Sequence, residues 1–560
     1  MTDLSAITRR ATLAGLSAGA AAVALPAGAR TALRASTRFR HGVASGDPDA
    51  TSVVLWTRVT AQDPLEVEWE LSGDLAFNRI VRRGRFATGP DRDFTVKVLA
   101  EGLTPGAHYY YRFRAGGETS PIGRTRTLPV GRLERLGIAL ASCSNYPFGY
   151  FNAYDAIAHD PAIDFVLHTG DYIYEYGADG WGAESGKRLG RVHQPANEIV
   201  SLNDYRTRHA QYKTDAGSQA MLAAKPLLAC WDDHESANNP WTGGAQNHQS
   251  ETEGDWAARR AASIQAYYEW MPVREPVAGR TRMQFWRSYA FGDLATLSTL
   301  ETRHTARALQ IDYAPYKKTI ASHADAAAME RDAIGATGRT MLAPELEADL
   351  AAAWARSREL RQPWRLIGNP MPIARTRVPD VVRLGLIPDP AAQDKPLGAA
   401  VDLAWKGKWN LPFYPDTWDG YEWARERLYS QARAAGVDDL VFLTGDSHSF
   451  WANRLADAEG RARGIELGTA GITSPGDFID SGFDPRTAAR LDAAFAEHNP
   501  EVVWTDNLHQ GYVRLALRRD RAEATFVAMD TVLSPHYRAF ALKRFGVVRA
   551  EAGLELQEFA

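Results

Sequence analysis

The sequence predicts an α/β protein in which a layered core of strands and helices follows an all-β domain. Up to about residue 130, short alternating strands are separated by Gly and Pro turns, and beyond it apolar runs alternate with helical patterns. The 560 residues are enough for two to four domains of roughly 150 residues each. A net charge of −4 without a long basic run argues against a nucleic-acid-binding surface.

The all-β domain is predicted over residues 38–130. Strands are expected at residues 52–56, 65–71 and 108–114, and the second of them alternates apolar and polar side chains. Short strands with this turn spacing are typical of a β-sandwich of the fibronectin or immunoglobulin type. We expect the domain to end near the segment 129–131.

Residues 135–560 are predicted to form the second domain. Buried strands interleaved with helices indicate a layered α/β core. The strands are expected at 136–141, 165–168, 226–229, 294–300, 364–367 and 439–443, and the helices at 253–271, 343–361 and 418–435. Two Gly-rich and charged segments, 176–215 and 372–403, are expected to be long surface excursions or lids near a site.

Residues 1–29 are interpreted as an export signal. Arg9 and Arg10 precede an apolar run over residues 14–25, and Ala27-Gly28-Ala29 supplies a cleavage site. The arginine pair indicates the twin-arginine translocation machinery as a partner and a periplasmic or secreted location. Because the apolar run is shorter than the ~20 residues of a membrane helix, no stable membrane span is expected. A basic tail before an Ala-rich helix is the alternative.

Four strands of the predicted core end in side chains that bind metal ions. Any one of these endings alone is more often a turn or a helix start. However, the carboxyl ends of strands in an α/β sheet line one crevice, so we expect the four endings to converge on a metal centre. The candidate ligands are Cys143, Asp171, Tyr174, Asp233, Asp446 and His448.

The donor types divide these candidates into two kinds. Thiolate, phenolate and imidazole groups suit a transition metal, whereas a carboxylate-rich neighbour suits a hard divalent ion. Cys143 has an alternative interpretation, because an exported protein with two cysteines commonly joins them in a disulfide. Its partner would be Cys230, which is otherwise interpreted as buried strand packing.

Three further residues are candidates for catalysis or substrate binding. His234 lies between Asp233 and Glu235 and is placed to protonate or stabilise the leaving group. The alternative is a histidine that only orients a ligating carboxylate, or one that packs in the core. Asn238 has an amide that can hold phosphate oxygens or a calcium ion. Arg303 follows the strand 294–300 and is expected to clamp phosphate, the alternative being a surface ion pair.

The ordered ligand set resembles the calcineurin-like metallophosphoesterases, whose motifs are D-x-H, G-D-x-x-D, G-N-H-[DE] and G-H-x-H. Here Cys143 replaces the first motif, Tyr174 ends the second, and Asp446 stands in the last. These departures resemble the PhoD-type alkaline phosphatases. Further matches to that family are Gly42-Val43-Ala44-Ser45-Gly46-Asp47-Pro48, Leu55-Trp56-Thr57-Arg58, Asp204-Tyr205-Arg206 and Trp418-Asp419-Gly420-Tyr421.

The resemblance implies a metallophosphoesterase catalytic domain over residues 135–560, built as a sheet sandwich flanked by helices. It also implies a ferric ion and one or two calcium ions, with a metal-bound hydroxide attacking a phosphate mono- or diester in line. Asp171 would bridge the metals. The implied iron ligands are Cys143, Asp171, Tyr174 and His448, and the implied calcium ligands include Asp233 and Asp446. A phospholipase D-like diesterase and a non-catalytic, metal-stabilised binding protein are the alternatives.

Overall fold

A computed structural model describes residues 38–550 and 553–559. The predicted export signal, residues 1–29, lies outside the described residues. Within the described part of the chain, every helix is too short or too polar to cross a membrane.

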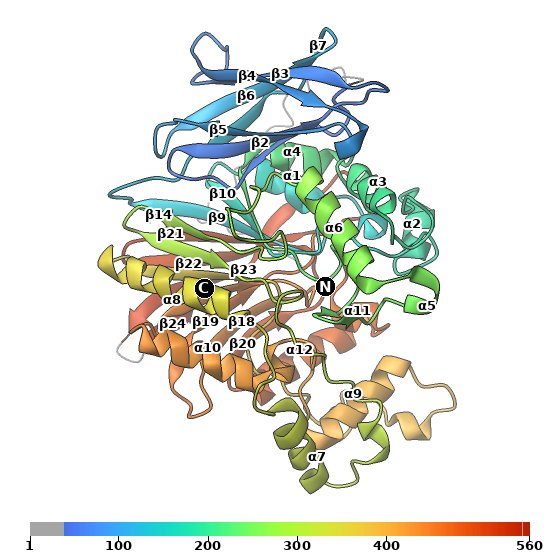
Figure 1. The fold of residues 1–560 in the computed structure, drawn as a ribbon. Coiled ribbons are helices and arrows are strands. Elements are labelled where there is room, and N and C mark those ends of the chain that lie inside the picture. The colour runs from blue at the N-terminus through green and yellow to red at the C-terminus, as the bar shows by residue number, and fades with distance from the viewer. Residues whose placement is uncertain (1–37, 551–552, 560) are drawn as a thin grey trace, which may run out of the picture. The chain divides into compact units, whose positions relative to one another are not determined.

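A ten-stranded sheet forms one half of the core (Figure 1). Strands β9, β10, β11 and β1 run parallel, and the strands towards both ends of the sheet pair antiparallel. Its order is β24 (Gly553–Glu558), β23 (Ala539–Ala550), β22 (Arg521–Met529), β21 (Gly511–Arg518), β9 (Arg135–Ala141), β10 (Phe165–His168), β11 (Leu227–Ala229), β1 (Val43–Gly46), β2 (Ser52–Arg58) and β5 (Thr95–Glu101).

A seven-stranded sheet packs against the first and completes a sheet sandwich. Phe165 and Leu167 of β10 share one buried cluster with Leu297 and Val441 of the facing sheet, whereas Val166 between them points to the opposite face. The order is β14 (Ser288–Phe291), β15 (Ala295–Thr299), β16 (Trp364–Asn369), β17 (Leu440–Thr444), β19 (Ala462–Gly468), β18 (Phe450–Ala456) and β20 (Val502–Asp506). The predicted core strands are therefore confirmed.

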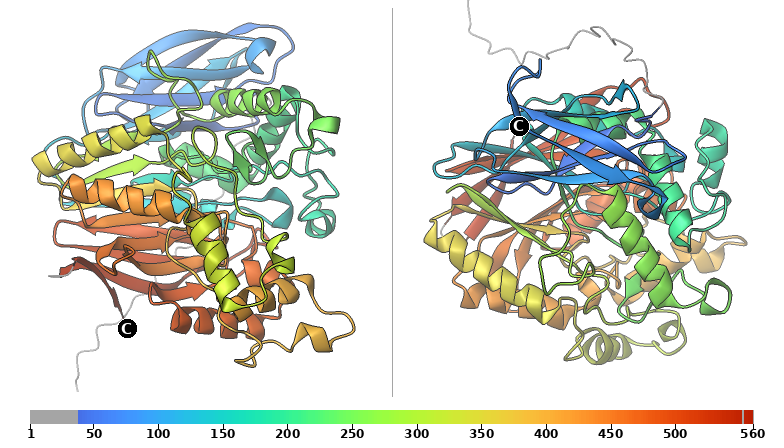
Figure 2. Two further views of the ribbon diagram at one scale, coloured as in Figure 1. Left: turned by 60° about the horizontal axis from the view of Figure 1, so that its bottom comes forward. Right: turned by 45° about the horizontal axis from the view of Figure 1, so that its top comes forward.

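Helices cover the outer face of each sheet, as expected for a layered core. Tyr205 and Tyr267 share a buried cluster with Val166 on one side, and Leu350 shares one with Phe442 on the other. Figure 2 shows the yellow α8 beside the orange α10. The helices on the ten-stranded sheet are α1 (Asn152–His159), α3 (Leu202–Tyr212), α4 (Ala216–Ala224) and α6 (Trp256–Trp270); those on the seven-stranded sheet are α8 (Pro344–Glu359) and α10 (Glu422–Ala434). The three predicted helices are confirmed.

The N-terminal region is all-β, as predicted, but its strands belong to two different sheets. Leu55 and Val96 of the ten-stranded sheet pack with Val67 and Phe113 of a separate five-stranded sheet. This second sheet consists of β3 (Leu65–Ser72), β4 (Ile80–Thr88), β6 (His108–Ala115), β7 (Glu118–Thr119) and β8 (Gly123–Arg126). One layer of the predicted sandwich is thus the edge of the core sheet.

A glycine makes this junction between the two regions possible. Gly46 of β1 pairs with Leu227 of β11, and a Cβ atom at Gly46 would lie 2.6 Å from the carbonyl oxygen of Pro272 and 2.8 Å from that of Leu227. Only glycine tolerates so close an approach of backbone to backbone. The first segment of the chain can therefore join the sheet of the second.

The two segments expected to be surface excursions contain helices. Residues 176–215 include α2 (Ala183–Leu189) and α3, which begins with a capping box between Ser201 and Asp204. The buried face of α3 consists of Tyr205, Arg208, His209 and Tyr212. Because two of these residues are polar, the sequence does not show the apolar stripe that usually marks a helix. Residues 372–403 lead into α9 (Gly398–Trp409).

The other α-helices of the described residues are α5 (Ser250–Glu253), α7 (His323–Met329), α11 (Asp477–Asp480) and α12 (Pro485–His498). In Figure 1, α7 and α9 lie away from both sheets. They have their own small buried clusters, which include Met329 with Leu411, and Leu403 with Phe495. The position of α11 matters for the site, because this helix begins shortly after Ser474, whose hydroxyl lies 2.9 Å from that of Tyr174.

Candidate metal centre

The predicted ligands follow strands of both sheets. Cys143 comes shortly after β9, Asp171 after β10 and Asp233 after β11, whereas Asp446 comes after β17 of the opposite sheet. The ligand atoms converge, as the sequence predicted, within three overlapping groups of neighbouring side chains. The candidate metal centre therefore lies where strand ends of the two sheets of the sandwich meet.

The backbone turns sharply at four of the ligands. A left-handed conformation is unfavourable for residues with a Cβ atom, and such residues gather at functional sites. The ligands with positive φ are Cys143 (61°), Asp171 (56°), Asp446 (66°) and His448 (54°). The surrounding loops hold these turns in place and direct the side chains into a common space.

Two motif glycines allow the ligand loops to contact one another. A Cβ atom at Gly170 would lie 2.4 Å from the backbone nitrogen of Asp232, and one at Gly445 would lie 2.3 Å from Oγ of Ser142. Each glycine precedes a ligand, Asp171 or Asp446. The Gly-Asp pairs seen in the sequence are thus required by close packing between loops.

One set of donor atoms, which we call the mixed-donor group, consists of Cys143, Asp171, Tyr174 and His448. Oδ2 of Asp171 lies 3.5 Å from Sγ of Cys143 and 3.1 Å from the hydroxyl of Tyr174, which in turn lies 3.3 Å from Nε2 of His448. Ligands at roughly 2.0–2.3 Å from one ion, in octahedral or tetrahedral geometry, are about 2.8–3.8 Å apart. The spacing of the mixed-donor group therefore fits a single transition-metal ion.

A second set, the carboxylate group, consists of Asp232, Asp233 and Asp446. Oδ2 of Asp232 and Oδ1 of Asp233 are buried and have no hydrogen-bond partner among the described residues. Buried carboxylate oxygens without donors are unfavourable unless a cation balances them. Oxygen donors of this kind suit a hard ion such as Ca²⁺. The residues present therefore fit a second metal site.

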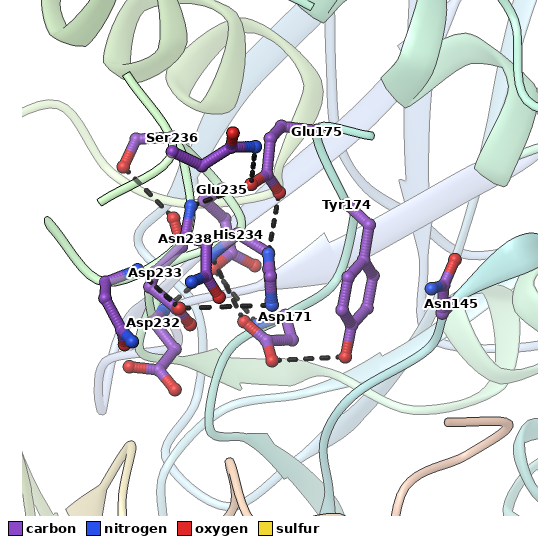
Figure 3. Close-up of polar contacts among 12 residues, drawn as sticks. Asn145, Asp171, Tyr174, Glu175, Asp232, Asp233, His234, Glu235, Ser236 and Asn238 are labelled. Carbon is purple, nitrogen blue, oxygen red and sulfur yellow. Dashed lines mark hydrogen bonds and ion pairs between the residues drawn. The ribbon is translucent and has the colours of Figure 1, made fainter. Parts of the chain in front are cut away.

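Asp171 belongs to the mixed-donor group and also lies beside Asp233 of the carboxylate group. Its Oδ2 lies near Sγ of Cys143. Figure 3 shows the contact of Asp171 with the hydroxyl of Tyr174 and the hydrogen bond of 3.3 Å that Oδ1 accepts from the backbone N–H of His234. Oxygens of Asp171 and Asp233 and a ring nitrogen of His234 also approach one another closely enough to hold a metal ion. The family resemblance implied that Asp171 bridges two metals, and this placement suits that role, which stays a prediction.

Burial changes the acidity of the ligands. Removal from water, reinforced by the Asp171 carboxylate, raises the pKa of both Cys143 and Tyr174 well above the usual value. Burial likewise raises the pKa of Asp171, although the neighbouring His234 opposes the shift. Bound cations reverse this effect, because they favour the deprotonated ligands. Metal binding is therefore expected to release protons.

Arg303 is fully buried among acidic side chains. Its Nε lies 2.5 Å from Oδ1 of Asp232, and its Nη2 lies 3.6 Å from Asp233 and 3.5 Å from Asp446. The alternative of a surface ion pair is wrong, because the side chain has no exposed area. Nη2 has no hydrogen-bond partner within the described part of the chain. This donor is consequently free to bind a further acceptor.

His234 is held by a buried carboxylate. Its Nδ1 lies 2.6 Å from Oε2 of Glu175, and its Nε2 lies 3.9 Å from Oδ2 of Asp233. The ring also lies against Tyr174, with the ring centres 4.2 Å apart. Burial alone would lower the pKa of His234, but the carboxylates of Asp233, Glu175 and Asp171 raise it well above its usual value. His234 therefore lies among the candidate ligands, buried and in contact with their carboxylates, and its role in proton transfer stays a prediction.

Sequence reasoning missed three acidic residues of the site. Asp232 belongs to the carboxylate group, and Glu175 orients His234. The carboxylate of Glu235 accepts hydrogen bonds from the backbone N–H groups of Asp171 (3.1 Å), Tyr172 (2.6 Å) and Asp232 (2.8 Å). Glu235 occupies the last position of the G-N-H-[DE] pattern, which was the signal that could have found it. Its role in joining two ligand loops depends on burial, which the pattern does not reveal.

The two cysteines are both free and buried. Sγ of Cys230 lies 3.4 Å from the carbonyl oxygen of Gly368, in the interior of the sandwich. The disulfide alternative is therefore wrong for this structure, and the packing interpretation of Cys230 agrees with its surroundings.

The open side of the site is lined by half-buried residues. Asp446 and His448 are half-buried, as are Asn238, Tyr176 and Trp181. The amide Nδ2 of Asn238 donates a hydrogen bond of 2.7 Å to Gln246. Tyr176 and Trp181 belong to the segment 176–190, which we call the strap. The first predicted excursion thus reaches the site.

Comparisons with known proteins agree on one family. The family model "PhoD-like phosphatase" matches residues 138–526, and the model "PhoD-like phosphatase, N-terminal domain" matches residues 24–129. Alkaline phosphatase D from Bacillus subtilis (strain 168) is 34% identical over 524 residues, which cover 89% of this chain and 78% of that protein. A solved structure described as "Structure of PhoD" has 31% identity and a TM-score of 0.74, covering 93% of this chain and 92% of its own.

Proposed function

The chain belongs to the PhoD-like phosphatase family and is a phosphoric ester hydrolase, and we propose that the mixed-donor group and the carboxylate group together carry out the hydrolysis of phosphate mono- or diesters. The observation that supports this proposal best is the convergence of ligands from four strand ends on one centre. A non-catalytic binding protein, the second alternative from the sequence, does not agree with the hydrolase activity that this family indicates.

The two groups are proposed to hold different ions. Phenolate and thiolate donors favour a ferric ion in the mixed-donor group, and the oxygen donors of the carboxylate group favour one or two calcium ions. When bound, such ions neutralise the charge of a phosphoester and lower the pKa of a water molecule that attacks phosphorus in line. Asp171 serves both groups, and Asn238 contributes its amide oxygen to a calcium ion or its N–H to the phosphate.

The remaining residues of the site position the substrate and transfer a proton. Nη2 of Arg303 is buried and has no hydrogen-bond partner in the described chain, only ion-pair distances of 3.5–3.6 Å to Asp446 and Asp233, which supports a contact between this group and a phosphate oxygen. His234 is proposed to donate a proton to the leaving oxygen, and Glu175 keeps its Nδ1–H bound so that Nε2 faces Asp233 and the substrate. These roles require fixed side chains, and Arg303, His234 and Glu175 are all buried.

Synthetic esters test the proposed activity. Metal-replete protein should hydrolyse p-nitrophenyl phosphate, bis(p-nitrophenyl) phosphate or both, and the ratio of the two rates distinguishes a monoesterase from a diesterase. Phosphatidylcholine tests the phospholipase D-like alternative, because that activity releases choline. Failure to hydrolyse all three esters with both metals bound would contradict the proposal.

We also propose that the protein is exported through the twin-arginine route. The pattern over residues 1–29 supports this proposal, and a metal-containing enzyme is a typical cargo of a pathway that transports folded proteins. Replacing both arginines by lysine (Arg9→Lys with Arg10→Lys) should leave the protein inside the cell. Arg30→Lys with Arg34→Lys, just after the predicted cleavage site, is the matched control and should be exported normally. Export of the first double variant at the normal rate would contradict this route.

A further inference from the structure

We propose that Tyr176 and Trp181 form an aromatic subsite for the leaving group, which favours phosphoesters whose leaving group carries a flat aromatic ring. The inference rests on the proposed function, because it takes His234 as the residue that faces the leaving oxygen. It goes beyond that function by naming a substrate class.

The two rings lie beside the two histidines of the centre. The ring of Tyr176 is centred 5.4 Å from that of His234, and the ring of Trp181 is centred 5.4 Å from that of His448, to which it is nearly parallel (18°). Tyr176 and Trp181 are centred 6.2 Å apart at 73°. They therefore form a continuous aromatic wall next to the residue proposed to protonate the leaving oxygen.

The surroundings of the strap hold Trp181 in this position. Its indole N–H lies 3.0 Å from both carboxylate oxygens of Asp480 in α11, and its ring packs edge-on against Phe148 with centres 4.8 Å apart. The following residue, Gly182, has φ of 93°, and a Cβ atom there would lie 3.1 Å from Pro147 and Phe148. Because the indole is already ordered, a ligand that stacks on it loses little additional conformational entropy.

The wall is accessible from outside the centre. Tyr176 and Trp181 are half-buried, in contrast to Tyr174, which is fully buried and directs its hydroxyl at Asp171. Half-buried aromatic side chains at the mouth of a polar site are surfaces on which flat groups stack. Alkyl and polyol leaving groups lack this interaction, so the wall discriminates between ester classes.

The experiment compares two esters whose leaving groups are equally acidic but differ in shape. Phenyl phosphate supplies the aromatic ring, and a fluorinated alkyl phosphate with an alcohol of matched pKa supplies the control. Trp181→Leu should lower kcat/KM for the phenyl ester about tenfold, in line with the size of ring stacking, and change the alkyl ester by less than about twofold. Trp181→Phe should recover most of the loss, and Tyr176→Leu should act in the same direction as Trp181→Leu.

A binding measurement separates stacking from an effect on turnover. Calorimetry with phenylphosphonate and methylphosphonate, which are not hydrolysed, should show that Trp181→Leu weakens only the phenyl compound. Trp423→Leu is a matched control, because Trp423 is a half-buried tryptophan of α10 that packs on the outer face of the seven-stranded sheet. The Trp423→Leu variant should leave the ratio of kcat/KM for the phenyl ester to kcat/KM for the alkyl ester unchanged.

Three outcomes would overturn the inference. Equal losses on both esters in Trp181→Leu would show that the strap only shields the centre. If no variant changed the ratio of kcat/KM for the two esters, the wall would not contact the leaving group. If the wild-type protein hydrolysed neither ester, the proposed function itself would fail, and this result is distinguishable because both substrates are then inert.

Discussion

The mixed-donor group and the carboxylate group lie side by side but differ in the atoms that they offer. The first combines sulfur, phenolic oxygen and imidazole nitrogen around Asp171, at separations of 3.1–3.5 Å. The second offers carboxylate oxygens and is approached by the guanidinium of Arg303. Donor type and geometry select metal ions more than overall affinity does. One crevice can therefore provide two chemically different sites that share a single residue.

The shared residue is expected to be the most sensitive position of this arrangement. Asp171→Asn removes the charge of the residue proposed to serve both groups. Since loss of a residue that only orients a ligand costs roughly 10–100-fold, we expect more than about a 100-fold loss of kcat. Hydrolysis of bis(p-nitrophenyl) phosphate measures the loss. Asp439→Asn, at an ion pair with Arg365 next to β17, is the control and should keep nearly full activity. Comparable activity in both variants would contradict the shared role of Asp171.

Chelation separates the two groups without mutation. EGTA removes exchangeable calcium quickly, whereas a ferric ion enclosed by buried thiolate and phenolate donors is expected to exchange slowly. A short EGTA treatment should therefore abolish most of the activity, and added calcium should restore it. The visible charge-transfer band expected from a phenolate-bound ferric ion should remain during this treatment. An enzyme that is indifferent to EGTA, or one that loses its colour with its activity, would argue against separate sites.

The Glu175–His234 pair is expected to affect catalysis more than metal content. Glu175→Gln keeps the size of the side chain but weakens the 2.6 Å contact that fixes His234, and we expect kcat to fall about 10- to 100-fold. The loss should be larger for an alkyl ester than for a p-nitrophenyl ester, because a poor leaving group needs the proton more. Glu501→Gln is the control, since Glu501 is a buried carboxylate that binds Arg375 instead. Identical losses on both esters would speak for a purely structural role.

The smallest effect on activity is expected at the second cysteine. Cys230→Ala leaves the ligands unchanged and removes a buried sulfur atom, so activity should stay within about twofold while the free energy of unfolding falls by about 1 kcal/mol. Cys143→Ala provides the contrast, because it should remove the visible band and the activity. Denaturant titration and absorbance measure the two effects. Similar behaviour of the two variants would remove the distinction between ligand and packing cysteines.

Much of the fold and the ligand set could be predicted from the sequence, because both are marked by residues that are neighbours in the chain. Apolar runs such as 165–168 indicate buried strands, and the polar residues directly after them, such as Asp171, mark strand ends. The helical stripe of α3 was hidden because one of its buried positions is an arginine, Arg208. The pairing of β1 with the core sheet depends on a contact at Gly46 with a strand far away in the chain.

The missed residues of the site share one property. Glu175 and Glu235 look like ordinary charged residues in the sequence, and only the folded chain shows that both are buried and accept several hydrogen bonds. Asp233 was predicted because it precedes His234 in the family motif, whereas Asp232 has no ligand position in that motif; the folded chain places the carboxylates of both beside Asp446. Burial and direction come from long-range packing, which a local pattern does not contain.

The most direct test of two distinct sites is elemental analysis of matched single-ligand variants. Cys143→Ser removes a ligand of the mixed-donor group only, and Asp233→Asn changes the carboxylate group, as the spacing of the donor atoms indicates. The wild-type protein should contain both a transition metal and calcium. The cysteine variant should lose the transition metal and retain calcium, and the aspartate variant should show the reverse. Loss of the same metals from both variants, or a single kind of metal in the wild type, would contradict the account.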